Sequence, residues 1–202
     1  TVYNSTTLTD QQKGDSLVNM LDDHLYHVIP KWDVECWDVV NEPWGNQQVN
    51  ELLPNTNTLV YWFKLADSLR QIYGKPNLQL AVNENSIIAN NLLYGDSKID
   101  QYMAILDTMI AEGAPIEMLG FQSRLKNGML SPDTIYSRLV RFERYGLPYQ
   151  ATEFELKDSP NYYYTPTEIK QATEESMITY FSHSKVEGFW YWSFCESPTG
   201  PD

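Results

Sequence analysis

The stretch WDVVNEPWG, residues 37–45, places a glutamate at the end of a short run that contains two adjacent valines. Such a run is typical of a buried strand, where a charged side chain is costly unless it is paired or protonated. Glu42 follows Asn41 and precedes Pro43, between two tryptophans of the same stretch. A carboxyl group in this position predicts a chemical role for Glu42.

Length, composition and charge narrow the class of protein. The chain has 202 residues, 42% of them hydrophobic, which predicts one domain, or a large part of one, with a real core. Its net charge of −13 would repel nucleic acid and anionic membranes, so a neutral ligand is expected. No run reaches the roughly 18 apolar residues of a membrane span, and no signal peptide is recognisable, so we expect a soluble chain without an export signal of its own. Cys36 and Cys195 are too few for a disulfide framework or a zinc site.

Hydrophobic periodicity predicts an alternation of helices and strands. Apolar residues at three- and four-residue spacing predict helices over residues 9–28, 58–73, 97–112, 132–145 and 167–183. Capping signals at Thr9, Ser131 and Thr165 support three of these helices. Short apolar runs bounded by turn residues predict strands over residues 36–41, 78–83, 118–122, 148–153 and 187–194.

This order of elements predicts an α/β fold. Apolar strands alternating with amphipathic helices form a parallel sheet covered by helices, either doubly wound or closed as a (β/α)8 TIM barrel. No glycine-rich phosphate loop follows any predicted strand, which disfavours a dinucleotide-binding fold and favours the barrel.

Polar residues gather where the predicted strands end. The residues concerned are Asn41 and Glu42, Asn83 and Glu84, Gln122 and Arg124, Thr152 and Glu153, and Trp190 with Trp192. In a barrel the carboxyl ends of the strands form the edge that carries the active site. The sequence therefore predicts one site to which five strands contribute.

Two of these residues suit glycoside hydrolysis. That reaction uses a pair of carboxyl groups, one protonated as general acid and one ionised. Tryptophans near Glu42 favour the protonated form, and Arg124 near Glu153 favours the ionised form, which suggests Glu42 as acid and Glu153 as nucleophile. A single glutamate at a strand end can also be a solvated loop residue, and that alternative stays open for Glu84 and Glu155.

Aromatic residues are abundant, with 6 tryptophans and 14 tyrosines. Sugar rings stack their C–H faces on aromatic planes, so Trp44 and Trp190 are candidate sugar contacts, whereas core packing accounts for most of the others. The three histidines, His24, His27 and His183, fall in predicted helices away from the strand ends. We expect no metal site and no cofactor.

The segments WDVVNE, NEN, FQSRL, ATEFEL and FWYW, in this order, resemble the second half of the family 10 glycoside hydrolases, the endo-β-1,4-xylanases. The resemblance implies that Glu42 is the acid/base and Glu153 the nucleophile of a retaining reaction, with carboxyl groups roughly 5–5.5 Å apart. It assigns Asn41 to the sugar 2-hydroxyl, and Gln122 and Trp190 to the cleaved sugar's site. Asn83, Glu84, Arg124 and Trp44 are further expected substrate contacts.

Two departures from the family pattern change the expectations. Arg124 stands where the family usually has a histidine bonded to the nucleophile, and we expect it either to pair with Glu153 or to reach a substituent of the substrate. The chain also corresponds to strands 4 to 8 only, so residues 1–202 are expected to be the C-terminal portion of one catalytic domain. Its expected partners are xylan or xylo-oligosaccharides, and either the N-terminal part of the same domain or an inserted carbohydrate-binding module.

The resemblance implies a secreted, periplasmic or cell-surface location. It also leaves two other functions open. One is a non-catalytic xylan-binding protein or inactive fragment, and the other is a retaining β-glycanase of the same clan that acts on glucan or mannan. The motif NEP alone would suit such relatives, for example family 5.

Overall fold

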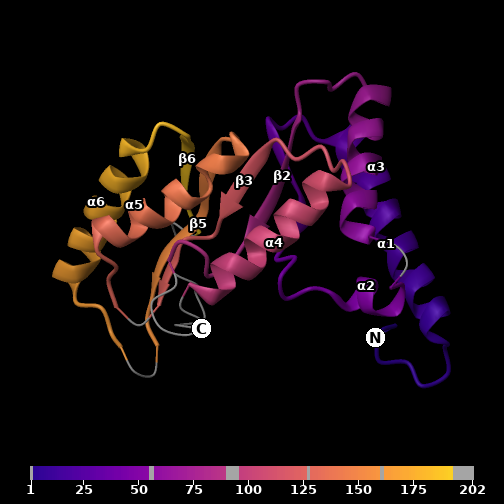
Figure 1. Cartoon of the computed structure of the whole chain (residues 1–202), viewed down its shortest axis with the longest axis horizontal. Coiled ribbons are helices and arrows are strands. Elements are labelled where there is room, and N and C mark those ends of the chain that lie inside the picture. The colour runs from indigo at the N-terminus through magenta and orange to yellow at the C-terminus, as the bar shows by residue number, and fades with distance from the viewer. Residues whose placement is uncertain (1, 55–56, 90–95, 127, 160–161, 193–202) are drawn as a thin grey trace. The chain divides into compact units, whose positions relative to one another are not determined.

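The structure is a computed structural model that describes residues 2–54, 57–89, 96–126, 128–159 and 162–192 (Figure 1). The elements are α1 (Asp10–Lys31), β1 (Cys36–Asn41), α2 (Gln48–Leu52), α3 (Thr58–Ile72), β2 (Gln79–Glu84), α4 (Ser97–Ala111), β3 (Met118–Phe121), β4 (Arg124–Lys126), α5 (Pro132–Arg141), the 3-10 turn η1 (Glu143–Tyr145), β5 (Tyr149–Lys157), α6 (Pro166–Ser182) and β6 (Val186–Tyr191). They form two compact units. Unit 1 comprises residues 1–82 and 102–118, and unit 2 comprises residues 83–101 and 119–202.

The predicted helices and strands are confirmed, with ends that differ by a few residues. Residues 193 and 194 of the last predicted strand lie outside the described residues. Two elements of the described residues were not predicted, the short helix α2 and the strand β4, and the helix predicted over residues 132–145 divides into α5 and the turn η1. The capping signals are also confirmed. Thr9 and Thr165 form capping boxes with Gln12 and Glu168, and the Ser131 side chain accepts the backbone N–H of Thr134.

The strands form a parallel sheet, as predicted. They pair in the order β1-β2-β3-β5-β4, and β6 also pairs with β5. The pairs β3–β5, β4–β5 and β5–β6 are parallel. The first half of the nine-residue strand β5 pairs with β3 and β6, and its second half pairs with β4. Strand β5 therefore organises unit 2.

Unit 1 is built on the packing of α1 and α3. Both helices turn apolar faces inward, with Leu25 and Ile29 from α1 and Phe63 from α3 almost completely buried. An ion pair adds to this core, since the buried Arg70 donates from Nη2 to Oε1 of the partly exposed Glu117 at 2.9 Å. Such a pair helps to fix α3, because the Arg70 guanidinium would be costly to bury without a partner.

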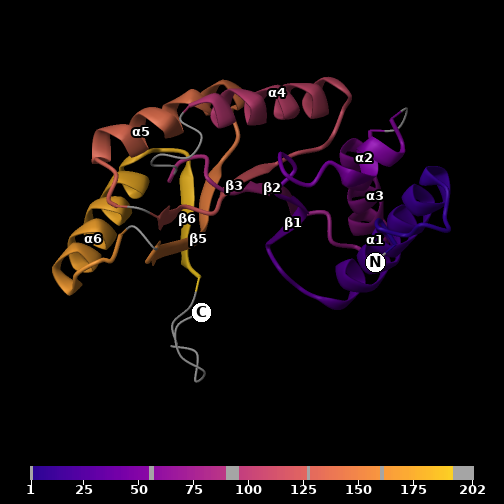
Figure 2. The same ribbon diagram turned by 90° about the horizontal axis from the view of Figure 1, so that it is seen from below.

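Unit 2 packs α5 and α6 together on one side of β5 and β6 (Figures 1 and 2). Phe154 of β5 stacks on Phe189 of β6, with ring centroids 4.7 Å apart. Phe121 of β3 contacts Phe142 in the same manner at 4.8 Å. Alternate residues of these strands thus enter the core, and the residues between them face the other side of the sheet.

Within the described residues, no helix is both long enough and apolar enough to cross a membrane.

Candidate active site

Glu153 lies in strand β5, at a point where the pairing of β5 with β6 is irregular. Its register against β6 shifts between Ala151 and Phe154. In a regular strand, Thr152 and Glu153 would point to opposite faces, yet both side chains bond to Asn83. The irregularity therefore directs two consecutive polar side chains to one place, as bulges beside functional sites commonly do.

Asn83, at the end of β2, holds Glu153 and is itself oriented by Thr152. Thr152 Oγ1 donates to Asn83 Oδ1 at 2.8 Å, and Asn83 Nδ2 donates to Glu153 Oε1 at 3.2 Å. An ionised carboxylate can only accept hydrogen bonds, so the amide must turn its nitrogen towards Glu153. Asn83 is almost completely buried, which leaves its amide few alternative arrangements.

Gly120 of β3 makes room for this contact between β2 and β5. A Cβ at residue 120 would lie 2.7 Å from Asn83 Oδ1 and 3.0 Å from Thr152 Cγ2. Both distances are shorter than or at the limit of normal packing, so a side chain would displace the hydrogen-bonded pair. Because residue 120 has no side chain, the hydrogen bond between Thr152 and Asn83 can cross over β3.

Arg124 occupies the other oxygen of Glu153. Its Nε and Nη2 donate to Glu153 Oε2 at 3.1 and 2.6 Å, and its Nη1 donates to Glu155 Oε2 at 2.8 Å. The parallel pairing of β4 with β5 aligns Arg124 with Glu155 in register. The guanidinium carbon lies 4.1 Å from the ring centroid of Trp192. The predicted pairing of Arg124 with Glu153 is thus confirmed as a contact.

Glu84 is fully buried and forms an ion pair away from solvent. Lys98 Nζ donates to Glu84 Oε1 at 3.0 Å and to Asn85 Oδ1 at 2.7 Å. Neither Glu84 nor Lys98 has an exposed side chain. In this arrangement Glu84 has no surface with which to touch a ligand, and the pair holds the loop after β2 to α4.

Gln122 joins the ends of β2 and β5 through its backbone. Its N–H donates to the carbonyl of Glu84 at 3.0 Å, and its carbonyl accepts from the N–H of Glu153 at 3.1 Å. Gln122 is also buried. Three of the predicted site residues of unit 2, Asn83, Gln122 and Arg124, are therefore brought into direct contact with Glu153.

Among the described residues, three other than glycine have left-handed backbones, and each lies within two residues of the end of a strand. They are Glu42 after β1, Ser86 after β2 and Ser123 after β3, with φ of 56°, 53° and 60°. Ser123 Oγ donates to the carbonyl of Phe121 at 2.9 Å and lies 2.5 Å from the Tyr180 hydroxyl. Burial raises the pKa of Tyr180, so this hydroxyl stays protonated and can donate to Ser123.

Glu42 belongs to unit 1, where a tight turn follows β1. Its carbonyl accepts the N–H groups of Gly45 at 3.2 Å and Asn46 at 3.0 Å. Glu42 and Trp44 are partly buried, and Asn41 is exposed. Glu153 belongs to unit 2. The two predicted catalytic carboxyl groups therefore belong to different units.

Trp190 and Trp192 face away from the aromatic core of unit 2. Their side chains are 59% and 54% exposed, whereas Phe189 and Tyr191 between and beside them pack inward. Large exposed indoles on one face of a strand are available for stacking on a ligand. Trp190 is a predicted sugar contact, and the ring of Trp192 lies against the guanidinium of Arg124.

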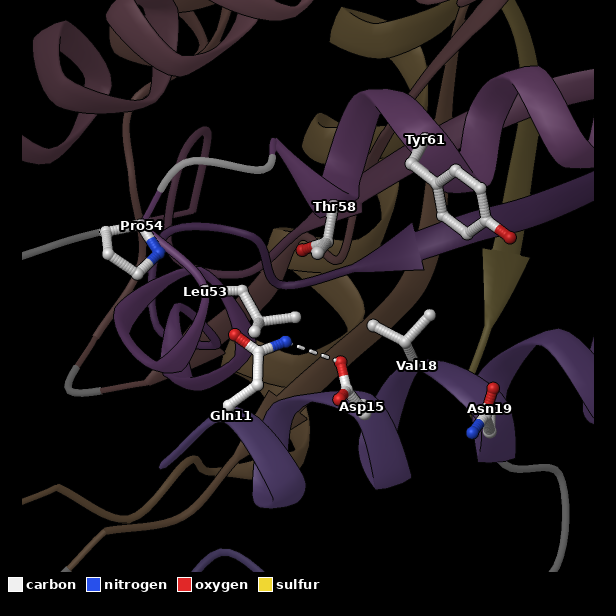
Figure 3. A pocket seen from close by; sticks show the side chains of 8 residues that line it. All are labelled: Gln11, Asp15, Val18, Asn19, Leu53, Pro54, Thr58 and Tyr61. Atoms are coloured by element: carbon white, nitrogen blue, oxygen red, sulfur yellow. Dashed lines mark hydrogen bonds between the residues drawn. The ribbon is translucent and has the colours of Figure 1, made fainter. Parts of the chain in front are cut away.

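Two of the hollows at the surface of unit 1 adjoin α1. A groove of about 310 Å³ runs beside β1, lined by the strand itself and by α1 and α3, and the buried Trp62 Nε1 that lines it has no hydrogen-bond partner among the described residues. A second pocket, of about 480 Å³, lies between α1, α3 and the segment after α2 (Figure 3). Its lining residues are Gln11, Asp15, Val18, Asn19, Leu53, Pro54, Thr58 and Tyr61. It contains none of the predicted site residues.

Within the part of the chain that the structure describes, no group of three His, Cys, Asp or Glu residues could hold a metal ion. The sequence reasoning overlooked Gly120 and Lys98. A glycine inside a short apolar strand is a signal of close backbone or side-chain approach, so Gly120 could have been found. Lys98 lies in a predicted helix, and nothing in the sequence indicates that it pairs with the buried Glu84.

Comparison with known proteins gives a consistent result. The family model described as Glycosyl hydrolase family 10 matches residues 3–199. Endo-1,4-beta-xylanase A of Halalkalibacterium halodurans is 26% identical over 157 residues, which cover 73% of this chain and 38% of the relative. Endo-1,4-beta-xylanase A of Phanerodontia chrysosporium is 28% identical over 133 residues, covering 63% of this chain and 30% of the relative.

Among solved structures, xylanase 10B from Thermotoga petrophila RKU-1 in complex with xylobiose has a TM-score of 0.70 at 22% identity. The alignment covers 93% of this chain and 56% of that structure. The xylanase from Bispora sp. MEY-1 gives a TM-score of 0.71 at 18% identity, covering 95% of this chain and 58% of the other. The chain therefore spans little more than half of these structures and shares their fold, as part of a (β/α)8 barrel.

Proposed function

The chain belongs to glycosyl hydrolase family 10, and we propose that it carries the catalytic carboxyl groups of a retaining endo-β-1,4-xylanase. Glu153 is the nucleophile and Glu42 the general acid/base. The observation that carries the proposal is the setting of Glu153, whose side chain is 13% exposed and whose two oxygens accept bonds from Arg124 and Asn83. Charge-assisted hydrogen bonds stabilise the ionised carboxylate and fix its direction, as a nucleophile requires.

The reaction proceeds in two displacements. In the first, a carboxylate oxygen of Glu153 forms a bond to the anomeric carbon, the bond from that carbon to the glycosidic oxygen breaks, and Glu42 gives its proton to the departing oxygen. In the second, water attacks the same carbon, Glu42 takes a proton from the water, and Glu153 leaves as a carboxylate. Two inversions retain the configuration of the sugar.

The substrate class is a neutral β-linked polysaccharide, with xylan as the proposed member. The names of the relatives support xylan, and one of the similar structures holds xylobiose. A net charge of −13 disfavours anionic ligands, and the exposed Trp190 offers a plane for a sugar ring. Because xylan is a polymer outside cells, we propose that the protein works outside the cytosol.

The remaining strands of the barrel are proposed to pack against β1. This strand ends the pairing order, and among the described residues no strand pairs with its other edge. An unpaired edge beside an apolar groove is a surface that another strand would cover. The share of the similar structures that this chain covers, 56% and 58%, supports the same view. The catalytic domain would then extend beyond residues 1–202, which form its C-terminal portion.

The test is release of the aryl group from an aryl β-xylobioside by the catalytic domain with its remaining strands present. We expect turnover that Glu153→Gln abolishes and that Glu187→Gln, a control at the exposed start of β6, leaves intact. Azide then assigns the roles, because it should rescue Glu153→Ala with inversion, giving an α-azide, and Glu42→Ala with retention, giving a β-azide.

The two alternative functions have different outcomes. Binding of xylo-oligosaccharides by a folded protein without any turnover would contradict hydrolysis and support a binding protein. Faster turnover of an aryl β-cellobioside or mannobioside than of the xylobioside would contradict the xylan assignment while leaving the carboxyl roles in place.

A further inference from the structure

The guanidinium of Arg124 is held in one position by three groups. Glu153 takes two of its N–H bonds, Glu155 takes one, and the indole of Trp192 covers its face at 4.1 Å. The side chains of Arg124, Glu153 and Glu155 are 17%, 13% and 28% exposed, so solvent screens these contacts only partly. A planar fork bonded on three sides is more rigid than a lysine ammonium would be in the same place.

This arrangement makes the two oxygens of Glu153 unequal. Oε2 accepts two bonds from the cation, at 3.1 and 2.6 Å, whereas Oε1 accepts one bond from the neutral amide of Asn83, at 3.2 Å. Short, charge-assisted bonds draw electron density to the bonded oxygen and occupy its lone pairs. Oε1 therefore keeps the more available lone pair.

We propose that Arg124 is a positioning residue that selects Oε1 of Glu153 as the attacking oxygen, and that Glu155 and Trp192 hold Arg124 in place for this task. The inference rests on the proposed function, since it concerns the nucleophile of that reaction. It differs from a substrate-binding role for Arg124, because all three types of nitrogen in the guanidinium already bond to protein carboxylates.

The position of the cation affects the two displacements differently. When Oε1 bonds to the anomeric carbon, the carboxylate becomes a neutral ester and its attraction to Arg124 weakens. When water releases the sugar, the bond between Oε1 and the carbon breaks, its electron pair returns to Glu153, and the ion pair re-forms. Arg124 thus favours release of the sugar from the enzyme, as any group that stabilises the departing carboxylate would.

The kinetic test uses a dinitrophenyl β-xylobioside, whose good leaving group makes release of the sugar the slower displacement. We expect Arg124→Gln to lower kcat about 10- to 100-fold without raising KM, the effect of losing bonds to a charged group. The kcat of Arg124→Lys should lie between those of wild type and Arg124→Gln, because lysine keeps the positive charge but lacks the planar, forked guanidinium. Lys126→Gln, an exposed cation on the same strand, is the matched control and should behave like wild type.

Two further variants separate positioning from a general structural effect. Guanidinium ion should restore part of the kcat of Arg124→Ala, whereas urea, a neutral molecule of the same shape, should not. Glu155→Gln should lower kcat less than Arg124→Gln, and the double variant should be no slower than Arg124→Gln alone, because Glu155 acts through Arg124. A kcat of Arg124→Gln within about twofold of wild type, or a rise in KM alone, would overturn the proposal.

A second measurement does not depend on turnover. In urea, Arg124→Gln and Glu153→Gln should shift the unfolding midpoint non-additively, since each removes the partner of the other. Additive shifts would show that Arg124 does not position Glu153 in solution. A folded wild type without turnover would overturn the proposed function and the selection of Oε1 with it, while the urea cycle would still decide whether Arg124 positions Glu153.

Discussion

Gly120 is a sensitive test of the site because it touches no substrate in the proposed reaction and yet sets the position of Asn83. In Gly120→Ala the new Cβ would begin 2.7 Å from Asn83 Oδ1. The amide would have to retreat by about 0.8 Å to reach an ordinary contact distance of about 3.5 Å. The Asn83–Glu153 bond, now 3.2 Å long, would then exceed the range in which it counts as a hydrogen bond.

The magnitude follows from the bond that is lost. A hydrogen bond to a charged group contributes about 1.5–3 kcal/mol, and about 1.4 kcal/mol corresponds to a factor of ten in rate. We expect kcat/KM on an aryl β-xylobioside to fall about 10- to 100-fold in Gly120→Ala. Overpacking at this buried site should also lower the free energy of unfolding by about 1–3 kcal/mol, which urea denaturation measures.

The reasoning is refuted if the cost of Gly120→Ala does not depend on Asn83. In an Asn83→Ala background the clashing amide is absent, so adding Gly120→Ala should lower kcat/KM by no more than about twofold. An equal loss in both backgrounds would mean that the methyl group acts elsewhere in the sheet. A fully active Gly120→Ala enzyme would mean that the Thr152–Asn83–Glu153 arrangement does not support turnover.

Three predictions concern stability. Lys98→Met should destabilise unit 2 by about 3–5 kcal/mol, because it removes the cation that pairs with the buried Glu84 carboxylate, and an unchanged urea midpoint would contradict this. Hydrogen bonds from Tyr162 and then Thr165 lower the pKa of Glu168 from 4.5 to about 2, so its contribution is present above pH 4.5 and is lost as the pH falls towards 2. In Glu168→Gln, α6 should lose less stability on acidification than in wild type, which hydrogen exchange at several pH values measures. An equal loss in the variant and in wild type would refute this prediction. Ser123→Ala should be less stable than Ser123→Gly by about 1 kcal/mol in thermal denaturation, since only glycine relieves the left-handed backbone, and the reverse order would contradict this.

Much of the architecture could be predicted because local signals and tertiary structure agree. Thr9, Ser131 and Thr165 cap helices that the sequence itself predicts, and the apolar runs between helices are short and bounded by turn residues, as strands are. The alternation then limits the fold to a parallel sheet with helices. The gathering of polar residues at strand ends also predicted the cluster around Glu153, since parallel strands present their carboxyl ends at one edge.

The details that decide the geometry of Glu153 could not be predicted in the same way. Strand β4 has three residues and forms only because Arg124 and its neighbours pair with the extended second half of β5. The irregular register of β5, which turns Thr152 and Glu153 to the same side, depends on the pairing of strands far apart in sequence. Side-chain period alone would have placed these two residues on opposite faces.

The left-handed residues connect strain with function. A residue other than glycine in this conformation costs about 1–3 kcal/mol, and it persists where surrounding contacts fix it. Ser123 is fixed by bonds to Phe121 and Tyr180, and the next residue is Arg124, which the turn therefore directs towards Glu153. Glu42 is fixed by two backbone bonds to its carbonyl. Glycine would make either turn at lower cost. The strain at residue 42 is therefore explained by what its side chain contributes to the proposed reaction. The strain at residue 123 is explained by the direction that the turn gives to the chain at the next residue.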